Sequence, residues 1–349
     1  MAVSSYGTTR KPRAIRESLL VTMLGDSGRR ADRQSVRGAR MKGLISFALK
    51  LTVTGFLLYL VWRYMQDLHL RSVLGGANFW WLGIAILLTI LQAGLAAVRW
   101  KEVLLRLRGI VLPVWLAFAW NGTSTLIGQV LPSTVGGDAF RVGALAAESD
   151  LSSGLRAVVA DRIIGLVALG IIVVVAGTLL IVASKSPTAW LPFVIGLAGC
   201  LGCVLVVLAG PYVPDRQKIL RPVKIISGDL RTLLAAPDKA ATLSLMSILI
   251  HVLSIVTFAT LAHALNLHDV ALFHIGIVVP CALLISAVPI SLGGWGLREG
   301  AMYIGFKLVG SDPAAAIVLS LMFGVANLAV ATMGTLLWLA TREKALQRR

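Results

Sequence analysis

Residues 131–141 read Leu-Pro-Ser-Thr-Val-Gly-Gly-Asp-Ala-Phe-Arg, and residues 288–299 read Val-Pro-Ile-Ser-Leu-Gly-Gly-Trp-Gly-Leu-Arg-Glu. Both stretches contain P-x-x-x-G-G-x-x-x-R in the same register, and the second copy begins 157 residues after the first. Self-similarity of this kind indicates an internal repeat. Because Pro lacks an amide donor and Gly tolerates unusual backbone angles, each copy predicts a break between two short helices.

The sequence around the two copies is that of a polytopic membrane protein. It is 57% hydrophobic and only 14% charged, and its mean hydropathy is +0.84. Apolar runs of about 20 residues match the length needed to cross a hydrocarbon core. We expect full spans at 43–61, 79–98, 158–182, 190–210, 241–265 and 313–340. Tryptophans near their ends, among them Trp100, predict anchoring at the membrane surfaces.

The basic residues predict the orientation of these spans. The formal net charge is +17, and it lies mostly in tails and loops. With the N-terminus inside, the inner segments hold 25 Lys or Arg and the outer loops hold three, as the positive-inside rule requires. This tally works only if stretches 111–141 and 272–309 each return to the side from which they entered. A single crossing by each would place the basic loop 211–240 outside.

The predicted fold is therefore all-α, with six full spans and two re-entrant hairpins of broken helix. The first hairpin enters from the inside and the second from the outside, which makes the halves an inverted-topology repeat. The expected organisation is a basic cytoplasmic tail over 1–42, repeats over 43–182 and 190–340, and a cytoplasmic tail over 341–349. Both termini are then cytoplasmic.

Each hairpin predicts an anion site. In this interpretation Gly-Gly forms the turn, and the following half-helix presents free N–H groups and a positive dipole end inside the membrane. Arg141 and Arg298 lie about one turn further along, where a guanidinium can bind a phosphate. The expected substrate-binding residues are Arg141, Arg298, Gly136, Gly137, Asp138, Gly293, Gly294, Glu299 and Asn121.

The same charges have a structural interpretation. Asp138 with Arg141, or Asp161 with Arg162, could form ion pairs that only lock the hairpins, because charges within a membrane are expected in pairs. If transport is coupled to protons, Asp161 and Glu299 are the candidate carriers. Polar residues of the first hairpin, including Asn121, are explained equally well by hydrogen bonds between helices.

These motifs resemble those of the lysylphosphatidylglycerol synthase/flippase transmembrane-domain family. The resemblance rests on the two Gly-Gly motifs together with Arg99-Trp100 and Asp161-Arg162, and it covers roughly residues 43 to 340. It implies movement of lipids, such as aminoacylated phosphatidylglycerol or lipid-linked intermediates, between leaflets. Stand-alone members accompany polyprenyl-phosphate and hopanoid pathways. The chain ends nine residues after its last expected span, so we do not expect it to lysylate lipid itself.

Other classes of chemistry have weaker support. Cys200 and Cys203 lie among glycines in an apolar run, which predicts close helix packing rather than a redox or metal site. The histidines form no metal-ligand pattern, and no phosphate-binding G-x-x-x-x-G-K-[ST] loop occurs, so we expect no cofactor and no nucleic acid partner.

We therefore expect a flippase that moves an anionic lipid across a bacterial inner membrane. The alternatives are a membrane enzyme acting on a lipid phosphate, with Asp138 or Glu299 as base, and a non-transporting accessory subunit that binds lipid-biosynthesis enzymes.

Overall fold

The computed structural model describes residues 52, 55–56, 59, 63, 75–130, 134–146, 150–184, 187–214, 216, 220–288 and 294–346. Throughout these residues the regular structure is helical, as the sequence predicts. The tail 1–42, nearly all of the expected span 43–61, and Pro132, Pro289 and Gly293 of the two motifs lie outside the described residues.

Five helices in the described part of the chain are long and apolar enough to cross a membrane. They are α3 (Phe79–Arg108), α6 (Leu151–Ala183), α7 (Leu191–Ala209), α9 (Pro237–Ala264) and α12 (Pro313–Leu346). Five of the predicted spans are thereby confirmed as long apolar helices. Helix α12 continues beyond the predicted span into the expected C-terminal tail, as far as Leu346.

The sequence explains where these helices begin. The side chain of Asn78 accepts a hydrogen bond from the amide of Trp80 at the start of α3, and Asp150 caps α6 in the same way. Hydrogen bonds from Ser152 and Ser153 lower the pKa of the Asp150 carboxyl to about 2. Helices α9 and α12 open on Pro, whose missing amide donor costs nothing in the first turn.

Two pairs of short helices lie between the long ones. They are α4 (Val114–Val130) with α5 (Thr134–Leu145), and α10 (Leu272–Ser286) with α11 (Leu297–Leu308). The predicted breaks in the two apolar stretches are therefore present. The 17 residues of α4 span about 25 Å, less than the roughly 30 Å of a hydrocarbon core.

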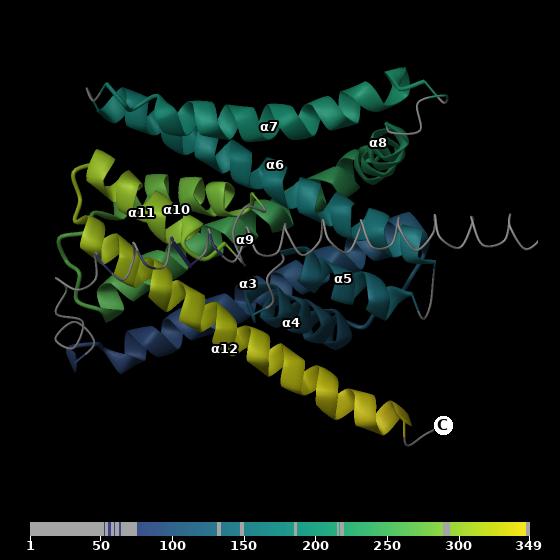
Figure 1. Ribbon diagram of the computed structural model, residues 1–349, viewed down its shortest axis with the longest axis horizontal. Helices are drawn as coiled ribbons and strands as arrows, with labels where there is room; N and C mark the ends of the chain where they lie inside the picture. Colours follow the sequence, from purple (N-terminus) through teal and green to yellow (C-terminus); the bar gives the residue numbers. More distant parts are fainter. Residues whose placement is uncertain are drawn as a thin grey trace, which may run out of the picture. The chain divides into compact units, whose positions relative to one another are not determined.

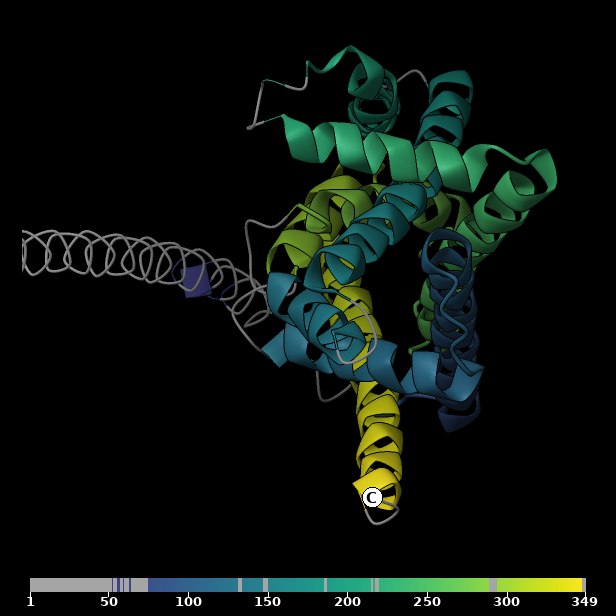
Figure 2. The same ribbon diagram turned by 90° about the vertical axis from the view of Figure 1, so that its right-hand side faces the viewer.

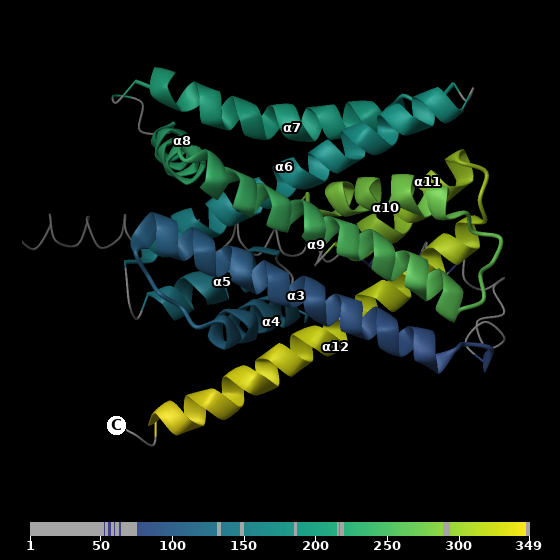
Figure 3. The ribbon, with the colours of Figure 1, turned by 180° about the vertical axis from the view of Figure 1, so that it is seen from behind.

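The two pairs lie at opposite ends of the helix bundle. Short connections place α4 and α5 where α3 ends and α6 begins, and place α10 and α11 where α9 ends and α12 begins. Helix α9 ends beside the start of α3, because the Asn78 amide donates to the Ala264 carbonyl at 2.7 Å. Figures 1 and 3, which view the molecule from opposite sides, show this separation.

The role expected for the glycines of the first motif is corrected by α5. This helix begins at Thr134, so Gly136 and Gly137 are helical and do not form the turn. A Cβ on Gly137 would overlap the carbonyl oxygen of Ser124. The glycine is needed because the backbones of α4 and α5 are in contact there.

The basic segment 211–240 contains a helix that the sequence analysis did not identify. After a short 3-10 turn at Gly210–Tyr212, α8 (Arg221–Leu234) lies across the direction of the long helices, end-on in Figure 1 and side-on in Figure 2. Its buried Asp229 accepts from Arg156 Nε and Nη2 of α6 at 2.7 and 2.6 Å. This ion pair between Asp229 of α8 and Arg156 of α6 therefore holds α8 against the bundle.

Small residues set the closest helix crossings. A Cβ on Gly122 of α4 would lie 2.8 Å from the Cα of Gly334 on α12, so two backbones touch. A Cβ on Gly196 of α7 would lie 2.9 Å from the Gly170 carbonyl oxygen of α6, and Cys200 packs on the same glycine. The prediction of close helix packing around Cys200 is confirmed.

Candidate functional site

Asp161 of α6 is the centre of a buried charge cluster. Arg99 Nε of α3 donates to Asp161 Oδ1 at 3.0 Å, and Arg141 Nη1 of α5 lies 3.5 Å from Asp161 Oδ2. The exposed fractions of Arg99, Arg141 and Asp161 are 8%, 8% and 4%. Three helices thus contribute charged groups to one point inside the bundle, where an ionisable residue is a functional candidate by default.

A second carboxylate extends the cluster along α5. Arg141 Nη2 donates to Asp138 Oδ1 at 2.6 Å, and Arg162 Nε lies 2.5 Å from Asp138 Oδ2. The predicted pairing of Asp138 with Arg141 is present. Asp161 instead pairs with Arg99 and Arg141, and its neighbour Arg162 pairs with Asp138, so the expected Asp161–Arg162 pair is wrong.

The charges of the less exposed members of the cluster balance. Arg99 and Arg141 face Asp138 and Asp161, whereas Arg162 reaches Asp138 from a side chain that is 45% exposed and has further contacts. Among the described residues, the buried Nε of Arg141 has no hydrogen-bond partner. A guanidinium group without a full set of partners can bind an anionic ligand.

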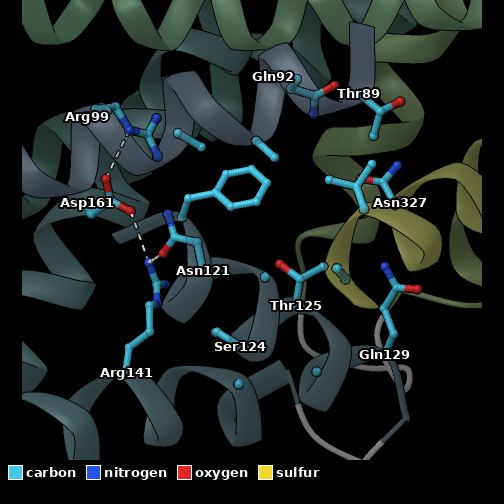
Figure 4. A pocket seen from close by; sticks show the side chains of 18 of the residues that line it. Thr89, Gln92, Arg99, Asn121, Ser124, Thr125, Gln129, Arg141, Asp161 and Asn327 are labelled. Carbon is cyan, nitrogen blue, oxygen red and sulfur yellow. Dashed lines mark hydrogen bonds and ion pairs between the residues drawn. The ribbon is translucent and has the colours of Figure 1, made fainter. Parts of the chain in front are cut away.

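The cluster lines a polar cavity of about 410 Å³ between α3, α4, α5, α6 and α12. Figure 4 shows Arg99, Asp161 and Arg141 on one side of this cavity, and Gln129 and Asn327 on the other. Asn121 of α4 lies between them and accepts a long hydrogen bond of 3.4 Å from Arg141 Nη1. Gly137 also lines the cavity, whereas Gly136 and Asp138 are not part of its lining.

The aromatic surroundings hold Arg141 in place. Its guanidinium carbon lies 5.4 Å from the ring centroid of Trp100, and Trp100 packs on Trp120 with a centroid separation of 6.0 Å. Trp100 is fully buried, so its expected place in a surface belt is wrong. The Trp100 indole therefore makes a cation–π contact with the Arg141 guanidinium.

The second motif forms a different structure. Gly294 and Gly296 have φ of +82° and +83°, which a turn into α11 requires and which other residues rarely adopt. Glu299 is completely buried and accepts from the Gly296 amide at 2.7 Å. The predicted role of the motif as a turn is therefore confirmed for Gly294, the described member of its Gly-Gly pair.

Arg298 ties this turn to α12. Its Nη2 donates to Glu299 Oε1 at 2.7 Å and to the Ser320 carbonyl at 2.9 Å, while its Nε donates to Ser320 Oγ at 2.7 Å. The guanidinium also lies 5.3 Å from the centroid of Trp295. The two arginines of the repeat are therefore not equivalent in their surroundings, because Arg298 and Glu299 do not line the cavity that contains Arg141.

Several cavity residues were not among the predicted site residues. The predicted span 79–98 ends just before Arg99, but α3 continues to Arg108 and buries it. Gln92 precedes Arg99 by seven residues, two helical turns, so both face the cavity. This spacing of polar residues within an apolar run was the available signal. Asn327 is likewise a polar residue within the apolar run of α12, seven residues after Ser320.

The comparisons with known proteins agree with the motifs. The model of the family described as "Lysylphosphatidylglycerol synthase TM region" matches residues 47–334, which is most of the chain. The match includes α3 to α11, the charge cluster and most of α12. No curated protein and no solved structure gives a match.

Proposed function

The chain belongs to the lysylphosphatidylglycerol synthase TM region family, and on this premise we propose that it moves an anionic, phosphate-bearing lipid or lipid-linked intermediate between membrane leaflets. The observation that carries the proposal is the cavity inside the bundle, which is lined by the paired charges of Arg99, Arg141 and Asp161 from three helices. The lipid phosphate binds at Arg141, whose side chain lines the cavity. Asp138 and Asp161 orient the guanidinium, and Asn121 binds a second headgroup atom.

The helix pairs support a mechanism of alternating access. We propose that α4–α5 and α10–α11 are re-entrant hairpins that enter from opposite faces, as parts of an inverted repeat with six full spans. Their position at opposite ends of the bundle supports this topology. The cavity lies beside the first pair, so it serves one leaflet in this conformation. A site at Arg298 forms only after its bonds to Glu299 and Ser320 open.

We propose that the chain lies in a bacterial inner membrane with both termini cytoplasmic, and that α8 lies on the inner surface, where anionic lipid attracts its basic residues. Asp161 is the proposed carrier if protons drive transport, because it lines the cavity. Glu299 takes part only if its hydrogen bonds to Arg298, Ser320 and Gly296 open.

Reconstitution of the full chain into liposomes tests the proposal. A phosphatidylglycerol probe labelled on its acyl chain should cross the bilayer faster with the protein, measured by the fraction bleached by an impermeant reductant. Arg141→Ala should lower that rate at least tenfold, and Arg141→Lys should retain part of it, since Lys keeps the charge without the guanidinium geometry. The exposed Arg216→Ala variant is the matched control and should keep the full rate.

The alternatives give different results in the same vesicles. Chemical conversion of the probe, detected by chromatography of the extracted lipid, would indicate a membrane enzyme. Unchanged lipid movement in the Arg141→Ala protein would contradict the site. Absence of both movement and conversion, with the protein correctly folded, would leave the accessory-subunit interpretation.

A further inference from the structure

We infer that a second cavity, between α6, α7, α10 and α11, binds one acyl chain of an anionic phospholipid from the leaflet at that end of the bundle. This apolar cavity has a volume of about 460 Å³ and lies beside the second pair of short helices. Binding of a chain there does not require lipid transport through the cavity at Arg141. The lining of the apolar cavity, its length and the position of its polar groups all point to this ligand.

The lining of the apolar cavity is suited to hydrocarbon. None of the described residues that line it is Asp, Glu, Lys or Arg, in contrast to the cavity around Asp161. Aliphatic side chains such as Leu180, Ile277 and Ile285 form most of its walls. Water gains few hydrogen bonds in an apolar cavity, and an empty cavity forfeits the contacts that its walls would otherwise make. Because the chain is a membrane protein, the molecules that can fill this space are lipid chains.

The apolar cavity can be reached from the side of the bundle. Helix α10 packs on both α6 and α7, whereas α11 packs on α10 and α12 (Figure 1). The cavity therefore separates α11 from α6 and α7. Ile304 and Leu308 of α11 line it and are 59% and 45% exposed. A lipid chain can thus enter past these two side chains without crossing a polar surface.

The apolar cavity has the length of one leaflet. His274 and Ile285, which both line it, lie eleven residues apart on α10. At the rise of an α-helix this separation is about 16 Å. The hydrocarbon core of a bilayer is about 30 Å thick, so one leaflet contributes about 15 Å. A cavity of this length matches one acyl chain rather than a small apolar molecule.

The polar groups of the lining lie at one end of the apolar cavity. Ser184 and Thr188 belong to the connection between α6 and α7, and His274 belongs to the first turn of α10. At the same end, Nδ1 of His274 and Oγ of Ser311 share a hydrogen bond of 2.6 Å. The lining further along α10 is apolar, as far as Ile285. An amphiphile therefore fits with its head at the His274 end and its chain extending along α10.

Lys307 favours an anionic head at this end. It is exposed in the last turn of α11, three residues after Ile304 of the cavity lining and so on the same side of the helix. A basic residue near the membrane surface attracts anionic lipid. The proposed occupant is a phospholipid such as phosphatidylglycerol, with its phosphate near Lys307 and one acyl chain in the apolar cavity.

Photolabelling of the full chain in nanodiscs tests this site. The probe is phosphatidylglycerol with a diazirine near the end of one acyl chain, in a bilayer of phosphatidylcholine. We expect labelling of the deep lining, at Cys281, Ile285 and Ala301, mapped by mass spectrometry of peptides. This labelling should saturate with probe and be displaced by unlabelled phosphatidylglycerol. Labelling of the exposed face of α7 should do neither, because bulk lipid contacts it.

Substitutions make the test specific. Ala301→Trp narrows the cavity and should lower the saturable labelling about tenfold, because excluding two methylenes from an apolar site has roughly that effect. Leu205→Trp, on the exposed face of α7 and outside the lining, is the matched control and should retain the labelling. Lys307→Ala should reduce labelling by the phosphatidylglycerol probe and leave labelling by a phosphatidylcholine probe with the same chain unchanged.

Several outcomes would overturn the inference. Labelling of the deep lining that does not saturate, or that Ala301→Trp leaves unchanged in a folded protein, would show ordinary contact with bulk lipid. Absence of labelling there would show that protein covers the cavity. Stronger displacement by a long polyprenyl phosphate than by phosphatidylglycerol would assign the cavity to another lipid, and an unchanged response of Lys307→Ala would contradict the position of the head.

Two features of this design keep its results interpretable. If Ala301→Trp does not fold, displacement of the probe from the unsubstituted chain decides between a site and bulk lipid. The readout is also independent of lipid movement. Saturable labelling of a chain that moves no lipid would therefore support the apolar cavity as a binding site while the proposed function fails.

Discussion

Asp161 lies between the guanidinium groups of Arg99 and Arg141. In the described part of the chain it is the one carboxylate that pairs with Arg99, while Arg141 also pairs with Asp138. Removing one partner of a buried ion pair leaves an uncompensated charge, which costs about 3–5 kcal/mol. We therefore expect Asp161→Ala to destabilise the purified protein by that amount, measured by denaturant unfolding in detergent. The exposed Asp238→Ala should change the free energy of unfolding by less than about 0.5 kcal/mol. Equal effects would contradict the assigned role of Asp161.

Asp150 gives a pH-dependent prediction outside the spans. Its pKa is lowered to about 2 by hydrogen bonds from Ser152 and Ser153, so the ionised carboxylate is favoured in the folded state. The contribution of this cap is therefore present above the unfolded pKa of about 3.9 and is lost as the pH falls through about 2. We expect Asp150→Ala to lower the Tm at pH 7 and to have a smaller effect at pH 2.5. Asp150→Ser retains a cap that does not titrate, and its Tm difference from Asp150→Ala should remain at both pH values.

At single residues, sequence reasoning identified the charges but only some of their contacts. It predicted Asp138 with Arg141, because they lie three residues apart in one short helix. It did not place Arg99 beside Asp161, because that contact joins α3 to α6 and depends on how the helices pack. Local spacing predicts pairs within a helix, whereas pairs between helices depend on tertiary structure.

At the level of elements, the positions of the long helices could be predicted and the function of a glycine could not. Hydropathy gave the five described spans, since apolar length is a local property. The same Gly-Gly pair reads identically in both motifs. Gly137 nevertheless permits contact between two helices, while Gly294 supplies a backbone angle for a turn. Both uses exploit the missing side chain, so sequence alone does not distinguish them.

The crossing of α4 and α12 gives a prediction at this scale. A side chain at Gly122 would press on the Gly334 backbone, which cannot move aside as a flexible side chain would. We expect Gly122→Val to separate the two helices and to destabilise the protein by about 1–3 kcal/mol, measured by denaturant unfolding. Because this crossing borders the cavity, lipid movement should fall as well. Gly83→Ala on α3, where an added Cβ would meet no neighbouring atom of the described residues within 4 Å, should be neutral or slightly stabilising. Comparable losses in both variants would contradict a specific role for the crossing.

Across the whole molecule, α12 connects the two motifs. Ser320 on this helix binds Arg298 of the second motif, and Asn327, two turns further along, lines the cavity of the first. The repeated sequence therefore does not produce two identical sites in one conformation. The first motif borders the cavity, whereas Arg298 of the second motif is bound to Glu299 and Ser320 and lies outside its lining. Alternating access would exchange these two states, and a shift of α12 would couple them.

In the proposed topology, the two ends of α4–α5 lie on the cytoplasmic side of the membrane, and the two ends of α10–α11 lie on the opposite side. Single cysteines can replace Val111 and Ala146, which flank α4–α5, and Asp269 and Asp312, which flank α10–α11, in a chain whose native cysteines are replaced by alanine. All four positions are exposed. An impermeant maleimide should label the first two only from the cytoplasmic side and the last two only from the opposite side. Labelling of Val111→Cys and Ala146→Cys from different sides would make α4–α5 a complete crossing, and the halves would then not be inverted. The positive-inside arrangement of segment 211–240 would fail with it, because one further crossing reverses the side of every later loop.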